Sequence, residues 1–418
     1  MKNVSIRKNY PELSTNLFFI MLVLSLSTTL FTIGFSQKIF YTLGYVSFFI
    51  VCYAYFKRRE LFAVVTPVFP LILALLITGV IRYCWFVYSK SDTSNFSEYD
   101  LNNLRNYDLS GKRFILSAFM IGAALVLSKF ITAKTITICK VILFVAIVIT
   151  AGVGCYEYFY VTHERIKLTA DAASSSSYMI LMAYASYLAL SRKTSQALEH
   201  LFDLFYAAII FALLILCETR ISVLAFIVVT VLYLLMNGDL KRYVKGRTII
   251  IASFVLALFI IGVTNQRWAE GIKNIEDYQT NSSTSLGARV AIWDSGIHFA
   301  SHHFLFSTPY QRTTFAQSYI KEHHPGNLEG YTNVRYNMHN EFLEILTLQG
   351  VLGLLFFALI YLSYLRVAIT KRVFTSAALP LSVMFVCGLA DSVLINAQTA
   401  MLFLISLTLC AISFNKQR

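Results

Sequence analysis

Charged residues are scarce in this sequence. Only 14% of its 418 residues are Asp, Glu, Lys or Arg, whereas 57% are hydrophobic, and the mean hydropathy is +0.63. A typical soluble domain carries about 25% charged residues, so the composition excludes an ordinary soluble enzyme. The repeated apolar runs of about 20 residues instead predict an all-α, polytopic membrane protein.

The motifs of the common metal- and nucleotide-dependent enzymes are also missing. The sequence contains no DxD, HExxH, GxSxG or GxxxxGK[ST] motif, and its seven cysteines show no CxxC spacing. The pairs His302-His303 and His323-His324 have no acidic or cysteine partner at a recognisable ligand spacing. We therefore expect no metal and no other cofactor. If a diphosphate leaves during a reaction, arginine must stabilise its charge.

Basic residues outnumber acidic ones and give a formal net charge of +13. Many of them stand in short connectors between apolar runs, such as Lys57-Arg58-Arg59 and the segment 241–247. The positive-inside rule assigns such connectors to the cytoplasm. The charge therefore reports membrane topology and argues against nucleic acid as a partner.

About twelve apolar runs are predicted to be membrane spans, with both termini in the cytoplasm. They cover approximately residues 14–35, 39–56, 61–88, 113–133, 136–161, 173–191, 201–217, 221–236, 248–264, 342–365, 374–395 and 397–414. Residues 1–264 and 341–418 are thus predicted membrane regions, and residues 265–340 a large polar loop on the outer side. Within the third run, Pro67 and Pro70 predict a kink, and Arg82 is expected to snorkel outward. Residues 89–112 are predicted to form a polar loop.

The large outer loop contains a predicted helix. From Ser285 onward, apolar residues recur every three or four positions, at Leu286, Val290, Trp293, Ile297, Ala300 and Phe304. This stripe is typical of a helix that lies in the membrane interface with its apolar face down. At 100° per residue, Arg289 lies about 60° from the stripe, at its edge. Its planar guanidinium suits a lipid phosphate, although an arginine that only anchors the helix in the interface explains the pattern equally.

His339 is the strongest candidate for proton transfer. It stands at the start of the tenth predicted span, where Asn337 or Asn340 could cap the helix. A helix N-terminus favours neutral imidazole and attracts anions, so this histidine could accept a proton beside a bound phosphate. The alternative is a purely structural hydrogen bond. Glu341 and Glu344 are weaker candidates for the base.

Two more ionisable residues are predicted at the outer membrane face. Arg220 stands two residues after Glu218 at the short turn between the seventh and eighth spans, where it pairs with this glutamate, snorkels to the membrane surface or binds substrate. Asp391 lies late in the eleventh span, where it either positions an arginine or emerges at the surface.

Taken together, these segments resemble the bacterial O-antigen ligases. The resemblance rests on Thr284–Arg289 (TSLGAR), on Met338-His339-Asn340-Glu341, and on Gly350–Gly353 (GVLG). The twelve-span layout, the single large outer loop, Thr219-Arg220 and the Asp of the penultimate span extend it over most of the chain.

The resemblance implies an enzyme of the bacterial inner membrane, with a GT-C-like glycosyltransferase architecture and an active site that faces the periplasm. Its donor would be O-antigen polysaccharide on undecaprenyl diphosphate, and its acceptor the outer-core sugar of lipid A-core in lipopolysaccharide biosynthesis. Transfer would be metal-independent and inverting. By the same resemblance, His339 would activate the acceptor hydroxyl, Arg289 and Arg220 would bind the diphosphate, and Asp391 would support the site.

Other functions remain open at this stage. An O-antigen polymerase, which joins repeat units on undecaprenyl diphosphate, has a similar architecture, as does a relative that attaches glycans to proteins. A flippase or transporter for lipid-linked sugars belongs to a different class. The scarcity of polar residues and of broken helices within the spans argues against transport.

Overall fold

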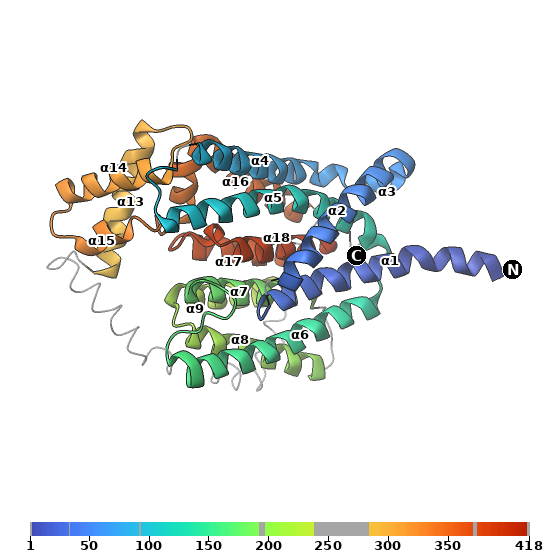
Figure 1. The fold of residues 1–418 in the computed structure, drawn as a ribbon. Helices are drawn as coiled ribbons and strands as arrows, with labels where there is room; N and C mark the ends of the chain where they lie inside the picture. Colours follow the sequence, from blue (N-terminus) through green and yellow to red (C-terminus); the bar gives the residue numbers. More distant parts are fainter. Residues whose placement is uncertain are drawn as a thin grey trace.

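The computed structural model describes residues 2–32, 34–91, 93–191, 197–237, 284–370 and 374–415, and every regular element in these residues is a helix. The first part contains α1 (Lys2–Thr29), α2 (Gly34–Lys57), α3 (Arg59–Phe62), η1 (Thr66–Val68), α4 (Phe69–Lys90), α5 (Glu98–Leu127), η2 (Ser128–Phe130), α6 (Ala133–Tyr156), the π-helix η3 (Glu157–Thr162), α7 (Ala173–Leu190), α8 (Ala197–Leu216) and α9 (Arg220–Asn237). The second part contains α13 (Ser285–His302), α14 (Pro309–His323), α15 (Leu328–Asn333), α16 (Glu341–Thr370), α17 (Phe374–Gly388), η5 (Val393–Ile395), α18 (Ala397–Ala411) and η6 (Ile412–Asn415). Most of the helices lie side by side in an elongated bundle, and α13, α14 and α15 gather at one end of it (Figure 1).

Six helical segments are long and apolar enough to cross a membrane, namely Glu12–Thr29, Gly34–Lys57, Arg59–Lys90, Glu98–Phe130, Ala133–Thr162 and Glu341–Thr370. Four shorter apolar helices accompany them, at Leu201–Leu216, Arg220–Leu235, Ala378–Gly388 and Ala397–Ala411. The prediction of an all-helical protein with many apolar helices is therefore confirmed for the described residues. The count of twelve spans stays a prediction, because the ninth run (248–264) and the basic connector before it lie outside them. The first part of the outer loop, residues 265–283, also lies outside the described residues.

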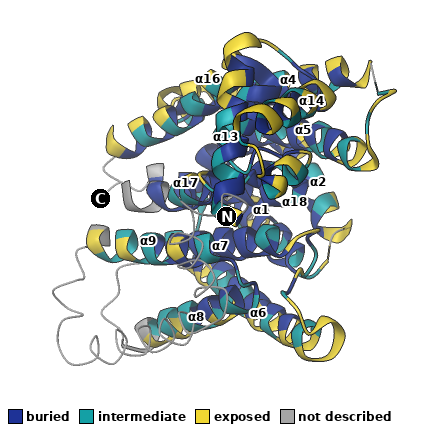
Figure 2. Cartoon of the chain, turned by 90° about the vertical axis from the view of Figure 1, so that its left-hand side faces the viewer, coloured by how far each residue is buried: buried dark blue, intermediate teal, exposed yellow. Residues whose placement is uncertain are grey.

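Helix α18 runs through the middle of the bundle. Every residue from Met401 to Ser413 is buried, and α18 packs against α1, α5 and α7. Large apolar side chains such as Phe49 and Tyr53 of α2 are exposed on the outside instead, and Figure 2 shows exposed residues on the outer sides of α6, α8 and α16. Apolar residues that face outward are expected where the surrounding solvent is lipid.

The third predicted span is broken where its prolines stand. Pro67 lies in the 3-10 helix η1, and Pro70 is the second residue of α4, so the predicted kink is confirmed. Arg82 of α4, however, does not reach outward. Its side chain is fully buried and pairs with Glu341, because a cation within an apolar bundle requires a counter-charge.

Two predicted boundaries are wrong. Helix α5 begins at Glu98, inside the segment predicted as a loop, because Ser97 and Asp100 form a reciprocal capping box. Leu104 and Tyr107 then give its polar first turns a buried face. Helix α17 ends at Gly388 and is followed by a turn. Asp391 therefore lies in a loop beyond the helix and not within a span.

Helix α13 begins at Ser285 as predicted, and the hydroxyl of Thr284 caps it by accepting the N–H of Gly287. The residues it packs against the protein are mostly small, namely Gly287, Ala288, Ala291, Ile292, Ser295, Gly296, Phe299 and Ala300. At 100° per residue, this buried face is centred about 150° from the predicted apolar stripe. Ile297 of the stripe is 57% exposed. Phe304 is 63% exposed as well, whereas Ala300 is buried and Trp293 packs against the protein, so only part of the stripe faces outward. Arg289 lies between the two faces.

The outer helices have a small core of their own, made of Ala291, Ile292, Ala316, Ile320, Val334 and Met338. They dock where α16 is broken at Gly350 (φ +69°, ψ −169°). There the connector between α13 and α14 bonds to the opened helix: Val351 N–H donates to Phe304 O, and Ser307 N–H to Leu348 O, each at 3.1 Å. These bonds hold the outer helices on the bundle.

Replacing Gly350 by alanine should destabilise the protein strongly. The added Cβ would clash with the carbonyl oxygen of Phe304, and only glycine adopts this backbone conformation readily. We expect a loss of about 3 kcal/mol from strain and overpacking, measured as a lower apparent melting temperature of the detergent-solubilised protein. Gly152→Ala in α6 is the matched control, because its Cβ meets nothing within 4 Å. Equal melting of the two variants would contradict the docking role of Gly350.

Candidate functional site

His339 lies in the turn immediately before α16. Its φ is +46°, which is uncommon for a residue with a side chain. Its N–H donates to Oδ1 of Asn337 at 2.7 Å, and its carbonyl accepts the indole N–H of Trp293 at 3.3 Å. Asn340 caps α16 by accepting two backbone N–H groups of the first turn, so one of the two predicted caps is confirmed. The backbone around His339 is thus held on both sides, while 26% of its side chain stays exposed.

Asp391 stands beside His339. Its Oδ1 is 3.7 Å from Nδ1 of His339, and its Oδ2 accepts the hydroxyl of Tyr178 of α7 at 2.8 Å. Burial raises the pKa of Asp391, but the adjacent His339 and the hydrogen bond from Tyr178 outweigh burial and leave the pKa below its usual value. This carboxylate is therefore ionised at neutral pH and can orient the imidazole. The sequence had suggested an aspartate that holds an arginine or emerges at the surface, and the structure pairs it with the histidine instead.

Arg289 approaches the same place from α13. It precedes Trp293 by four residues, so the two share one side of the helix, and Trp293 contacts the backbone of His339. The half-exposed guanidinium also lies close enough to Tyr178 for an electrostatic interaction. Arg289, His339 and Asp391, which are far apart in the sequence, are thus brought together around Tyr178.

Arg220 is the first residue of α9, which packs against α7 and α17. In the first turn of α9, the hydroxyl of Ser222 lies 2.6 Å from that of Ser177. Ser177 directly precedes Tyr178, so the start of α9 lies next to the start of α7. Arg220 therefore belongs to the same end of the bundle as the other three residues.

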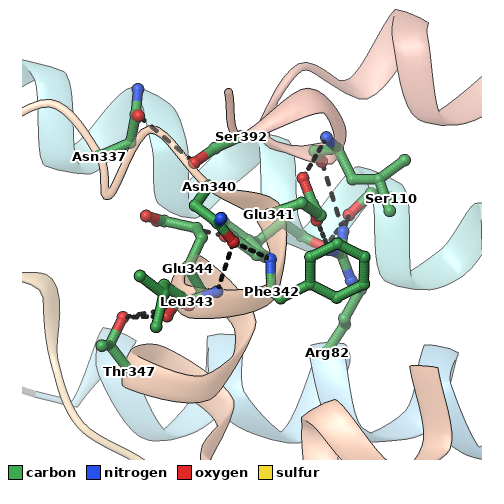
Figure 3. Close-up of polar contacts among 12 residues, drawn as sticks. Arg82, Ser110, Asn337, Asn340, Glu341, Phe342, Leu343, Glu344, Thr347 and Ser392 are labelled. Carbon is green, nitrogen blue, oxygen red and sulfur yellow. Dashed lines mark hydrogen bonds and ion pairs between the residues drawn. The ribbon is translucent and has the colours of Figure 1, made fainter. Parts of the chain in front are cut away.

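Two carboxylates in the first turn of α16, those of Glu341 and Glu344, hold the two loops of the site. Figure 3 shows Glu341 next to Arg82. Oε2 of Glu344 accepts the N–H of Met338, the residue before His339, at 2.8 Å. Oε2 of Glu341 accepts the N–H of Leu394, three residues after Asp391, also at 2.8 Å. Each carboxylate thus fixes one of the two loops that carry the ionisable pair.

Both carboxylates are paired with buried arginines. Nη2 of Arg82 lies 3.3 Å from Glu341, and Nη1 of Arg312 of α14 lies 2.7 Å from Glu344. All four side chains are at most 2% exposed. The two glutamates therefore serve as fixed acceptors and not as free bases. Sequence reasoning missed these pairs, although an arginine within an apolar run, as at position 82, already indicates a partner.

A second group of polar side chains joins α13 to α14 further out. Asp294 lies 2.8 Å from Nε2 of His324 and 3.4 Å from Nδ1 of His298, and it accepts the hydroxyl of Tyr319 at 3.2 Å. Burial raises the pKa of Asp294, but these hydrogen bonds and the nearby histidines outweigh burial, so its pKa lies below its usual value. Within the described residues, no group of three or more His, Cys, Asp or Glu side chains has an arrangement that could hold a metal. We interpret this cluster as a bridge between helices.

Neutralising Glu344 should loosen the site from the bundle. Glu344→Gln keeps the size of the side chain but leaves Arg312 without its counter-charge, which we expect to cost about 3 kcal/mol. Glu322→Gln, on the exposed face of α14, is the matched control and should change stability by less than about 0.5 kcal/mol. The measurement is the apparent melting temperature of the purified protein. Indistinguishable melting of the two variants would show that the buried pair does not hold these elements together.

Comparison with known proteins gives two matches. A family model described as O-antigen ligase matches residues 205–358, a range that includes Arg220, Arg289 and His339 and ends before Asp391. The chain is also similar to an O-antigen ligase of Escherichia coli (strain K12), with 26% identity over 368 residues that cover 86% of this chain and 84% of the relative. The resemblance predicted from the motifs is therefore confirmed: residues 205–358 match the O-antigen ligase model, and the chain is similar to an O-antigen ligase over most of its length.

Proposed function

We propose that this protein is an O-antigen ligase that transfers O-antigen polysaccharide from undecaprenyl diphosphate to the outer-core sugar of lipid A-core. The observation that carries the proposal is the apposition of His339 and Asp391, 3.7 Å apart, beside the helix of Arg289 in a chain with the O-antigen ligase domain. A histidine–carboxylate pair next to an arginine suits a reaction in which a hydroxyl is deprotonated and an anion departs.

His339 is the general base of the proposed reaction. Asp391 lies beside Nδ1 of the imidazole and favours the tautomer that is protonated there, which leaves Nε2 free to take a proton. Nε2 removes the proton of the acceptor hydroxyl while the hydroxyl oxygen forms a bond to the anomeric carbon of the donor sugar. The bond between this carbon and the diphosphate oxygen breaks, and undecaprenyl diphosphate leaves with the electron pair. A single displacement of this kind inverts the anomeric configuration.

The arginines stabilise the departing diphosphate. Arg289 stands at the edge of the apolar stripe, where its guanidinium can bind a phosphate at headgroup level while the exposed Ile297 and Phe304 contact lipid. Arg220, at the start of α9, is the second phosphate ligand. Charge that develops on the leaving oxygen is stabilised best by cations already in position. In this proposal the arginines supply that charge, and no metal takes part.

The proposed location follows from charge and topology. The protein spans the bacterial inner membrane about twelve times, with both termini in the cytoplasm and α13–α15 in the periplasm. The basic connectors support this orientation. In it, the lipid-linked donor and the lipid A-core acceptor both reach the site from the periplasmic leaflet of the membrane. The arrangement is that of a GT-C-like glycosyltransferase.

Two alternatives make different demands on the same site. An O-antigen polymerase would use the same base and arginines with a lipid-linked repeat unit as acceptor. A flippase would need no base at all. The partly exposed imidazole, oriented by an ionised aspartate, favours an enzyme over a flippase.

His339→Ala and Arg289→Ala should each abolish detectable glycan transfer while the protein accumulates normally in the membrane. Loss of a general base costs about 100- to 10,000-fold in rate, and loss of one electrostatic contact to the leaving group costs about 100- to 1,000-fold. The measurement is transfer of O-antigen to lipid A-core by purified protein, with both lipids supplied.

His323→Ala and Lys321→Ala on the exposed face of α14 are matched controls that should keep full activity. Full activity of either site variant would refute the roles proposed for His339 and Arg289. Movement of the lipid-linked glycan without transfer by the wild type, unchanged in His339→Ala, would identify a flippase.

Deleting the gene in its host should separate ligase from polymerase. A ligase deletion leaves complete core without O-antigen, and polymer accumulates on undecaprenyl diphosphate. The lipopolysaccharide is analysed by gel electrophoresis and the lipid-linked glycans by extraction. Core that carries a single repeat unit would instead mean that the protein is the polymerase.

A further inference from the structure

The end of the bundle opposite to α13–α15 contains an apolar hollow that the proposed reaction does not use. It lies between α1, α2 and α5, beneath α3, and has a volume of about 690 Å³. Its walls are formed by Val46, Phe49, Ile50, Tyr53, Ala54, Leu61, Val126, Leu127 and Phe130. Phe49 and Tyr53 are 69% and 58% exposed, so the hollow opens sideways to the solvent around the bundle. A space of this size is typical of sites for small molecules.

Cationic side chains surround the mouth of this hollow. Arg58 lines it directly, and its neighbours Lys57 and Arg59 mark the end of α2 and the start of α3. Lys129 reaches the same place, since its Nζ lies 3.5 Å from the carbonyl oxygen of Glu60. Arg58 and Lys129 thus lie at the mouth, with Lys57 and Arg59 next to Arg58 in the chain, and Glu60 is the one acidic residue that lines the hollow.

These cations differ from two other lysines of the bundle, which are paired. Lys140 pairs with Asp203 at 3.0 Å, and Lys112 with Asp108 at 2.7 Å. Within the part of the chain that the structure describes, Lys57, Arg58 and Arg59 make no ion pair. The positive-inside rule explains why basic residues stand here. It does not explain why unpaired cations surround an apolar hollow.

We propose that this hollow binds an anionic phospholipid, with an acyl chain along its apolar wall and the phosphate between Arg58 and Lys129. Apolar walls next to a cluster of basic residues are the features that recognise an anionic headgroup at the cytoplasmic leaflet. In the orientation proposed above, the mouth lies at that leaflet. The guanidinium of Arg58 can form two parallel hydrogen bonds to a phosphate. The excess of cations over Glu60 selects an anionic lipid over a zwitterionic one.

Native mass spectrometry of the full-length, detergent-purified protein tests this site. The protein is titrated with phosphatidylglycerol and, separately, with phosphatidylethanolamine. Wild type should retain phosphatidylglycerol preferentially. The double variant Arg58→Ala/Lys129→Ala should bind it about 25-fold more weakly, because each cation near the headgroup contributes about 1 kcal/mol, or about fivefold.

Two further variants separate the hollow from general surface charge. Val46→Trp fills the hollow from an exposed position of α2 and should weaken binding with no change of charge. Arg366→Ala removes an exposed cation from α16, away from the hollow, and should bind as wild type does. Unchanged binding by the double variant, or an equal loss in Arg366→Ala, would overturn the proposal. Equal binding of both lipids, insensitive to all substitutions, would indicate ordinary bilayer contact and would overturn it as well. Glycan transfer plays no part in these measurements, so their outcome is independent of the proposed enzyme activity.

Discussion

Four charges buried at one end of an apolar helical bundle hold the site together. Glu341 and Glu344 stand in the first turn of α16, and each faces an arginine from a distant part of the chain, Arg82 or Arg312. An ion removed from water costs several kcal/mol, which its partner and further hydrogen bonds must offset. The remaining lone pairs of both carboxylates accept backbone N–H groups of the two loops beside them. The position of these loops therefore depends on the pairing of each glutamate with its arginine.

In this arrangement the backbone of His339 is fixed, whereas its side chain stays partly exposed to solvent. The turn of this residue is held by Asn337, by Trp293 and, through Met338, by Glu344. The outer helices that carry Arg289 have only a small core, so they rely on the bundle for their position. The break of α16 at Gly350 and the pair between Arg312 and Glu344 supply that attachment. The exposed side of the imidazole can then contact a substrate, while Asp391 and the fixed backbone set its orientation.

Hydropathy predicted the positions of those helices that are apolar along their whole length. The proline break before α4, the start of α13 and the cap of α16 were also predicted, because each depends on residues that are neighbours in the chain. The start of α5 was missed because a capped amphipathic turn has a polar average composition. The end of α17 was missed because an apolar loop such as 389–395 has the hydropathy of a helix.

By itself, the sequence determined the class of protein, the sign of the charge on each connector and the residue types able to handle a proton and a phosphate. These properties depend on composition and on spacing along the chain. Only the tertiary structure decided which charges meet. Arg82 and Glu341 are 259 positions apart, and Tyr178 and Asp391 are 213 apart, so no local pattern relates them. The low dielectric of the bundle interior makes such pairing obligatory, but the packing of the helices selects the partner.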